Sequence, residues 1–141
     1  HSLSFPHWKE YVALLKDLLQ DEAALLEIVR LVGIDSLSQR DRVKLHAAQM
    51  IREDYLHQNA FHAVDTYTSI EKQYGMLDLI VTWIRNANEA LDVGVEYKAM
   101  ENLAVNERIS HIKYVAEKDF DKEAKALKRD IIAAFNSLKE E

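Results

Sequence analysis

Residue pairs that could do acid-base chemistry are present in this chain as adjacent carboxylates. General acid-base catalysis needs two carboxyl groups whose environments separate their pKa values, which usually requires that one of them is buried. The adjacent pairs are Asp21-Glu22, Glu53-Asp54 and Glu140-Glu141. Their flanking residues give no sign of burial, so we expect all of these pairs to lie on solvated helix faces.

Serine and histidine are also placed for structure rather than for catalysis. Ser36, Ser38 and Ser69 lie where predicted helices begin, and a hydroxyl group there caps free backbone N–H groups. His57 and His62 are five residues apart, so a regular helix would not present both to one metal ion. We therefore predict helix caps and hydrogen-bonded histidines, with no catalytic residue and no metal site.

Phosphate chemistry and thiol chemistry lack the residues that they need. A P-loop requires the pattern G-x-x-x-x-G-K-[ST], which does not occur among the three glycines. There is no cysteine, which excludes disulfides, zinc–thiolate sites and thiol catalysis. The net charge of −6 gives no basic surface for nucleic acid, so we expect proteins or small molecules as partners. No apolar run approaches the ~18 residues that span a bilayer, and no direct membrane insertion is expected.

The composition favours one helical domain. Of the 141 residues, 48% are hydrophobic and 30% are charged, which is enough for one core in a chain too short for two. Three glycines and one proline leave few of the residues that hairpin turns require. Because the chain begins with His, we expect a piece of a longer protein, with residues 1–7 as a linker or a remnant of the cut and residues 8–141 as the domain. We assign residues 1–7 no part in the fold.

Hydrophobic spacing predicts a first helix that starts near Pro6 and ends at Gly33. Its apolar positions are Tyr11, Leu15, Leu18, Leu25, Val29 and Val32. After a short polar break, Ser38 and Asp41 form a capping pair that opens a second helix. The inner face of this second helix carries Val43, Ala47, Met50 and Ile51. We expect the two helices to form an αα-hairpin.

The rest of the chain predicts further helices. Thr68 and Glu71 form a capping box for a third helix, which should end near Gly94. Its apolar stripe is Ile70, Tyr74, Leu77, Val81, Ile84 and Leu91. A shorter helix should lie between residues 96 and 112. The closing helix has an apolar face of Phe120, Ala124, Leu127, Ile131, Phe135 and Leu138, with Lys122, Lys125, Lys128 and Lys139 turned outward. The predicted fold class is all-α, a single bundle of about five helices.

Several segments of the chain, taken together, resemble a known protein family. They are 27–33, the loop 35–41, 51–56 and the run Gln58-Asn59-Ala60-Phe61, followed by 65–67, 71–74, 109–115 and Phe120. In order and spacing they resemble the C-terminal helical domain of the catalytic A subunit of A-type and V-type rotary ATPases. The residues that follow Gln58 and Asn59 are closer to archaeal and bacterial A subunits than to eukaryotic ones, so we expect a prokaryotic, archaeal-like source.

The resemblance implies a part of a proton- or sodium-translocating ATP synthase or ATPase. In that family a preceding nucleotide-binding domain holds the P-loop with ATP or ADP and Mg, so no cofactor and no activity are expected for this chain alone. The implied partners are that nucleotide-binding domain, the B subunits of the catalytic hexamer and the subunits of the central stalk. The implied location is cytoplasmic, peripheral to the membrane within the ATPase complex.

The resemblance also implies an adenine-binding segment at Gln58, Asn59, Ala60 and Phe61. An aromatic face can stack on a base for ~1–3 kcal/mol, and a small residue beside it lets the base approach. The alternative is that Phe61 is a core residue, which would gain a similar ~1.5–3 kcal/mol by burial.

A rotor contact is implied for the loop between the first two helices, which occupies the position of the acidic loop by which F-type β subunits push on the shaft. The residues are Ile34, Asp35, Ser36, Leu37, Ser38, Gln39, Arg40 and Asp41. Asp35, Arg40 and Asp41 could meet complementary charges that slide past without deep burial. The alternative is an ordinary solvated hairpin loop.

Together these sites give a hypothesis in which nucleotide occupancy swings the bundle as a rigid body and the hairpin turns that swing into torque. Two alternatives stay open. A free-standing helical adaptor would hold a partner helix in an apolar groove and would not respond to nucleotide. A small independent hydrolase would show turnover by the isolated chain.

Overall fold

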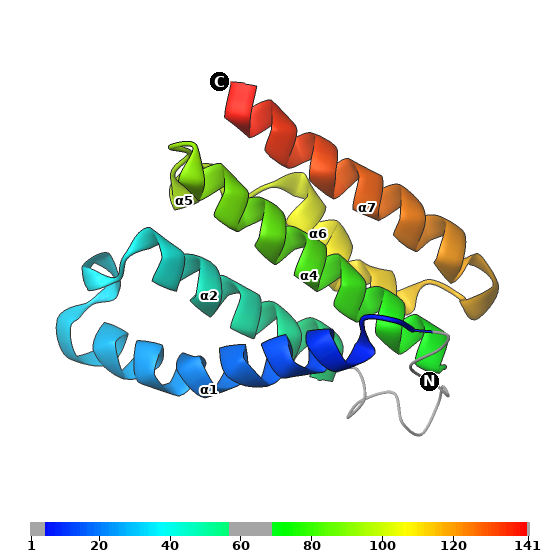
Figure 1. Ribbon diagram of the computed structural model, residues 1–141, viewed down its shortest axis with the longest axis horizontal. Coiled ribbons are helices and arrows are strands. Elements are labelled where there is room, and N and C mark those ends of the chain that lie inside the picture. The colour runs from blue at the N-terminus through cyan, green and yellow to red at the C-terminus, as the bar shows by residue number, and fades with distance from the viewer. Residues whose placement is uncertain (1–4, 57–68, 141) are drawn as a thin grey trace.

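Two antiparallel helices, α1 (Trp8–Val32) and α2 (Gln39–Met50), form the predicted hairpin (Figure 1). The computed structural model describes residues 5–56 and 69–140. Helix α1 ends at Gly33, whose φ of 95° lies in the left-handed region that glycine enters at low cost. His7 is its N-cap, so Pro6 precedes the helix and does not occupy its first turn as predicted.

The start of α2 confirms the capping pair. The backbone N–H of Asp41 donates a hydrogen bond of 3.1 Å to Ser38 Oγ, which satisfies one of the free amides of the first turn. The 3₁₀ turn η1 (Ile34–Ser36) fills the break between the helices, and Ser36 Oγ donates to the carbonyl of Gly33 at 2.7 Å. Ser36 therefore stabilises the turn and does not cap a helix start.

Helix α2 continues without a break into a π-helical turn, η2 (Ile51–Leu56). The next described helix is α4 (Ile70–Asp92). Its N-cap is Ser69, which confirms the predicted cap at this serine, whereas the capping box predicted one residue earlier, at Thr68, was wrong. Ser69 Oγ accepts from the N–H of Lys72 at 3.0 Å. The same hydroxyl donates to Glu117 at 2.9 Å, a contact across 48 residues that local sequence signals could not show.

Helix α4 is the centre of the bundle, and it packs against α1, α2 and α7. The predicted stripe is buried at Leu77, Val81 and Ile84. It was too narrow, however, because residues on the other faces are buried as well. These residues are Met76, Leu79, Ile80, Trp83, Ala87 and Ala90. A helix that is apolar on most of its circumference is typical of a core position.

Two short helices, α5 (Tyr97–Met100) and α6 (Ala104–His111), lie where a single one was predicted. Asn106 explains the break between them. Its Nδ2 donates to the carbonyls of Met100 at 3.0 Å and Glu101 at 3.1 Å, so the end of α5 is satisfied by a side chain. Its Oδ1 accepts from Trp83 Nε1 at 2.7 Å, which ties this corner to α4.

After the 3₁₀ turn η3 (Ile112–Tyr114), helix α7 (Glu117–Glu140) closes the bundle beside α4 (Figure 1). Its predicted apolar face is confirmed, with Phe120, Leu127, Ile131 and Phe135 buried. The residues that the structure describes thus contain six α-helices and no strand, which confirms the all-α class. Within these residues no helix is both long and apolar enough to span a membrane.

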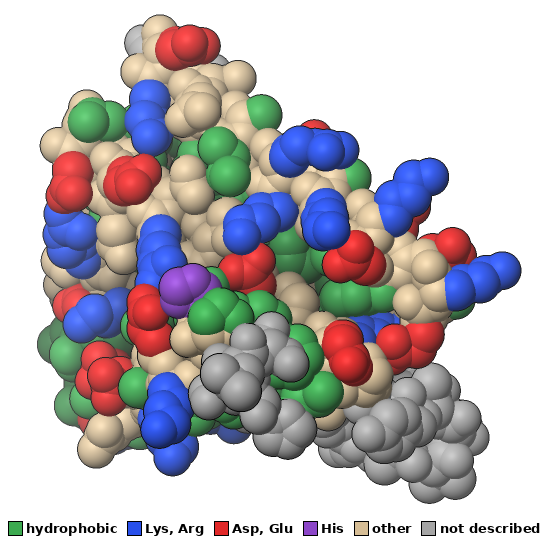
Figure 2. Space-filling view, turned by 45° about the vertical axis from the view of Figure 1, so that its right-hand side comes forward, with side chains coloured by type: hydrophobic (Ala, Val, Ile, Leu, Met, Phe, Trp, Pro, Cys, Tyr) green, Lys and Arg blue, Asp and Glu red, His purple; other side chains and the backbone are tan. Residues whose placement is uncertain are grey.

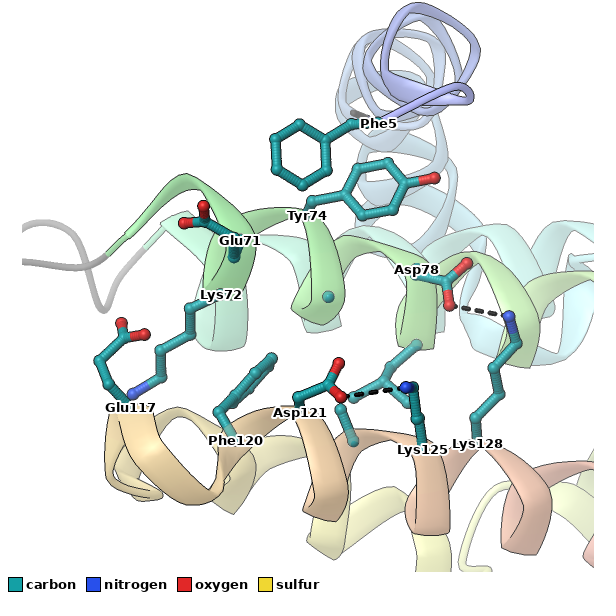
Figure 3. A pocket seen from close by; sticks show the side chains of 13 residues that line it. Phe5, Glu71, Lys72, Tyr74, Asp78, Glu117, Phe120, Asp121, Lys125 and Lys128 are labelled. Carbon is teal, nitrogen blue, oxygen red and sulfur yellow. Dashed lines mark hydrogen bonds and ion pairs between the residues drawn. The ribbon is translucent and has the colours of Figure 1, made fainter. Parts of the chain in front are cut away.

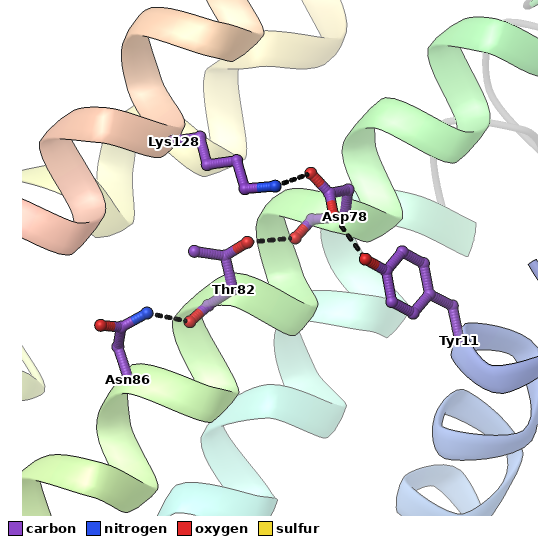
Figure 4. A network of polar contacts seen from close by, with 5 residues as sticks. All are labelled: Tyr11, Asp78, Thr82, Asn86 and Lys128. Carbon is purple, nitrogen blue, oxygen red and sulfur yellow. Dashed lines mark hydrogen bonds and ion pairs between the residues drawn. The ribbon is translucent and has the colours of Figure 1, made fainter. Parts of the chain in front are cut away.

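A polar network around Asp78 joins α1, α4 and α7 (Figure 4). Tyr11 donates to Asp78 Oδ1 at 2.6 Å, and Lys128 Nζ donates to Asp78 Oδ2 at 2.9 Å. Burial, and next the hydrogen bond to Asp78, raises the pKa of Tyr11, so its hydroxyl stays a donor. Lys128 was predicted to point outward; instead it turns back to α4 because Asp78 offers an opposite charge.

The close approach of α4 and α7 depends on Gly75. A Cβ at this position would lie 2.5 Å from Cε2 of the buried Phe120 ring. At an exposed position inside a helix, alanine is more favourable than glycine by about 1 kcal/mol. We expect Gly75→Ala to lower the free energy of unfolding by about 1–2 kcal/mol despite that preference, because the ring must move. Urea denaturation would measure the change.

The matched control is the same substitution in a Phe120→Leu background. Leucine lacks the ring atoms nearest to the added methyl group. The penalty for alanine should therefore shrink or reverse. A more stable Gly75→Ala protein in the wild-type background would show that the ring contact is not limiting.

Candidate functional site

The hairpin tip, defined here as residues 31–41, has a small core of its own. Leu37 is buried against Leu25 of α1 and Leu45 of α2, with Val29 packed beside them. This cluster is separate from the main core of the bundle. Leu37 was predicted as part of the rotor contact, but burial removes its side chain from any such surface. Its role in the structure is to hold the turn against both helices.

Polar contacts fix the rest of the tip to the bundle. Arg40 pairs with Asp92 at the end of α4 and donates to Asn88 Oδ1 at 3.3 Å. Gln39 Oε1 accepts from the backbone N–H of Tyr97. Of the predicted charged contacts, Arg40 is thus already paired, whereas Asp35 forms no ion pair with another described residue.

The tip exposes three apolar side chains beside its polar ones. Leu31, Val32 and Ile34 are 65%, 68% and 39% exposed. Val32 was predicted to face inward, but α2 begins only at Gln39, so the last turn of α1 has no helix to pack against. Leu31 and Val32 were missed as surface residues for the same reason. The predicted stop at Gly33 and start at Ser38 already implied this overhang.

The predicted adenine-binding residues Gln58, Asn59, Ala60 and Phe61 lie outside the described residues, as do His57 and His62. The structure describes what flanks them. The π-helix η2 ends at Leu56, and α4 begins after Ser69. Both flanking ends lie at the opposite end of the bundle from the hairpin tip (Figure 1).

A groove of about 400 Å³ runs between the first turns of α4 and α7, close to this end (Figure 3). Its aromatic walls are Phe5, Tyr74 and Phe120. Phe5 and Tyr74 have ring centroids 5.0 Å apart, so this residue of the 1–7 segment does pack on the fold, contrary to the prediction. Its ring covers apolar surface that would otherwise face water.

The cations of the groove are engaged inside the chain. Lys128 bonds to Asp78 at 2.9 Å and Lys125 to Asp121 at 3.0 Å (Figure 3). Lys72 donates to the carbonyl of Val115 at 2.8 Å. On the face shown in Figure 2, basic and acidic side chains alternate without a large patch of one sign. A triphosphate bound in the groove would therefore compete with these internal contacts for the lysines.

Two of the adjacent carboxylates are buried, which corrects the prediction of solvated faces. Glu22 is 6% exposed and accepts from Arg52 Nε at 3.1 Å and Nη2 at 2.5 Å. Asp54 is also 6% exposed and lies 3.9 Å from Lys113 Nζ. The pairing cations come from distant parts of the chain, so no local pattern could indicate that either carboxylate is buried.

The environment of Asp54 differs from that of an ordinary surface carboxyl. Burial raises its pKa to about 6, and the charge of Lys113 opposes that shift only in part. The carboxyl lines a hollow of about 200 Å³ together with His46 of α2 and Glu107 of α6. Burial also lowers the pKa of His46 to about 4. His46 stacks on Trp83 with ring centroids 4.4 Å apart, so it is a core histidine.

With this geometry described, comparison with known proteins identifies the family. The family described as the C-terminal domain of V and A type ATP synthase matches residues 2–101. The chain belongs to this family. It is 52% identical over 125 residues to the V-type ATP synthase alpha chain of Thermoanaerobacter pseudethanolicus. This alignment covers 86% of this chain and 21% of that protein. It is 50% identical over 123 residues to the V-type ATP synthase alpha chain of Clostridium botulinum, covering 87% and 20%.

These matches confirm the resemblance that the sequence analysis described. The chain spans about a fifth of the length of these relatives. Both organisms are bacteria, so an archaeal-like source stays a prediction.

The leucine cluster of the hairpin tip leads to a testable prediction for this ATP synthase domain. Leu37→Ala removes the centre of a separate cluster, so we expect a local loss of about 2–4 kcal/mol in the protection of the tip amides 34–38. The amides of α4 and α7 should keep their protection, because their core does not include Leu37. Native-state hydrogen exchange measures both. Leu26→Ala, at a leucine of α1 that is 44% exposed, is the matched control and should leave the tip unchanged.

Proposed function

We propose that this domain is the C-terminal part of the catalytic A subunit of a proton- or sodium-translocating ATP synthase or ATPase, and that it transmits nucleotide state to the central rotor. The observation that carries the proposal is the match of most of the chain to V-type ATP synthase alpha chains at about 50% identity. The proposed partners are the preceding nucleotide-binding domain, the B subunits and the central stalk, with the complex peripheral to the cytoplasmic side of the membrane.

The stiffness of the hairpin supports a mechanical role. Helix α1 has 25 residues. At 1.5 Å per residue it is about 37 Å long, comparable to a small domain. The Asp78 network ties its first half to α4 and α7, and the Leu25–Leu37–Leu45 cluster ties its last turns to α2. A displacement applied at one end is therefore transmitted to the tip with little bending.

The arrangement of the two predicted sites also supports this role. The residues that flank the predicted adenine segment and the hairpin tip lie at opposite ends of the bundle (Figure 1). In the proposal, ATP or ADP with Mg binds in the preceding domain, since the lysines of the groove between α4 and α7 are engaged in internal contacts. Gln58, Asn59, Ala60 and Phe61 add an adenine contact, and the tip contacts the stalk.

The tip contact can be tested in the assembled complex. Ile34→Asp places a charge in the exposed apolar surface of the tip, so we expect rotor torque to fall by at least about half while ATP still binds. Single-molecule rotation measures torque. Ile132→Asp on α7 is the matched control, because Ile132 and Ile34 are both 39% exposed. Equal torque in both variants and in the wild type would contradict a rotor contact at the tip.

The adenine contact can be tested by titration of the intact parent subunit. Loss of one stacked ring costs about 1–3 kcal/mol, so Phe61→Ala should weaken ATP binding by about 5- to 150-fold. Tripolyphosphate has no base, and its affinity should not change. A free-standing adaptor would show no ATP response in either protein. A Phe61→Ala subunit with wild-type affinity for ATP would leave Phe61 as a core residue.

A further inference from the structure

Arg42, in the first turn of α2 directly after the hairpin tip, carries a half-buried guanidinium group without an acceptor. Its Nε is buried and makes no hydrogen bond within the described residues. Nη1 and Nη2 also lack an acceptor there, but they still reach solvent. A buried N–H group without an acceptor costs free energy, and so does a partly desolvated cation without a counter-charge. The position of this cation is therefore not explained by a hydrogen bond or an ion pair within the part of the chain that the structure describes.

The other arginines, all of which the structure describes, differ from Arg42 in this respect. Ion pairs with a carboxylate are formed by Arg30, Arg40, Arg52, Arg85 and Arg108. Arg129 forms no ion pair with a described residue, but it lies exposed on α7, where water solvates its charge. Among these residues, Arg42 is thus the arginine that is both half-buried and without a carboxylate.

Tyr97 of α5 holds the side chain of Arg42 in one orientation. The guanidinium carbon lies over the tyrosine ring, 5.0 Å from its centroid. The tyrosine itself is fixed, since its backbone N–H donates to Gln39 Oε1 and its hydroxyl lies 2.8 Å from His46 Nδ1. A planar guanidinium stacked on an aromatic ring can still offer its terminal nitrogens for two parallel hydrogen bonds. Arg42 is therefore oriented for an acceptor that the described residues do not supply.

The charges nearby indicate which acceptor fits. Burial raises the pKa of Tyr97, and the charges of Glu101 and Arg42 act on that pKa in opposite directions, so a carboxylate already lies in this neighbourhood. Arg40 and Lys44, the cations that are closest in sequence, are paired with carboxylates. Phosphate groups of nucleic acids are bound by sets of cations, which this place lacks. A single guanidinium in such surroundings matches a single carboxylate.

We propose that Arg42 is a docking residue that binds an acidic side chain, aspartate or glutamate, of a neighbouring subunit. Nη1 and Nη2 donate two parallel hydrogen bonds to the two oxygens of that carboxylate. The inference rests on the proposed function, in which this end of the bundle contacts another subunit. It adds a directional contact to the exposed apolar side chains of the tip, because a bidentate pair fixes the relative orientation of its two members.

Zero-length cross-linking of the assembled complex tests this contact. Arg42→Lys places an amine where the guanidinium lies, and a carbodiimide joins an amine to a carboxylate only where the two are in contact. We expect mass spectrometry to find a cross-link from position 42 to an aspartate or glutamate of another subunit. Arg129→Lys is the control, at an exposed arginine without an ion pair to a described residue, and it should give no cross-link to that acidic residue.

Removal of the charge provides a second measurement. Arg42→Met keeps an unbranched stem against the ring of Tyr97 but removes the donors. The concentration at which half of the complex dissociates, measured by mass photometry on dilution, should rise about tenfold or more, because the partner's carboxylate is left unpaired. The urea midpoint of the chain should not fall, since no described carboxylate loses an ion pair. A lower midpoint would overturn the proposal, because Arg42 would then act as an internal support for Tyr97.

The remaining outcomes separate this contact from the proposed function. A wild-type subunit that does not assemble with B and stalk subunits would contradict the proposed function, and the contact would fall with it. If the complex assembles but Arg42→Lys is cross-linked to no other subunit, or only to Glu101 of its own chain, the contact alone is wrong. Unchanged dissociation of the Arg42→Met complex would lead to the same conclusion.

Discussion

Burial of α4 on most of its circumference is the constraint on which the rest of this structure depends. A helix of 23 residues can be buried on several faces only if other helices cover each face, and here α1, α2 and α7 do so. Polar groups on such a helix need partners within the bundle. Asp78 and Trp83 obtain theirs from α1, α7 and α6. The same contacts that satisfy α4 therefore set the positions of the surrounding helices.

The packing around α4 does not support the end of the hairpin, which local contacts stabilise instead. Helix α1 runs past the start of α2, so the residues around Gly33 extend beyond the main core. A separate leucine cluster and the pairing of Arg40 with Asp92 hold them in place. The extension is held rigidly, and it exposes Leu31, Val32 and Ile34 beside polar side chains. It is consistent with a contact surface in a larger assembly.

The features predicted correctly from the sequence are those that local chemistry determines. Gly33 ends a helix because of its own backbone freedom, and Ser38 begins one because its hydroxyl reaches an amide three residues on. The errors concern groups whose partners are distant in sequence. The buried Glu22 meets Arg52, and Lys128, which was predicted to point outward, meets Asp78 across 50 residues. The all-round burial of α4 likewise depends on which helices surround it, and periodicity within one helix cannot show that.

The charged side chains buried beside the π-helix are explained by the backbone conformation that they impose. Replacing a buried ion pair with apolar side chains is often neutral or stabilising, so Asp54 and Lys113 are not explained by stability. A raised pKa means that the ionised form of Asp54 costs the fold free energy near neutral pH. The pair restricts the backbone of the turn instead, because few conformations of η2 let one cation contact both a carboxylate and a carbonyl. That restriction acts on the last described turn before residues 57–68, where the position of the chain matters most to the proposed function.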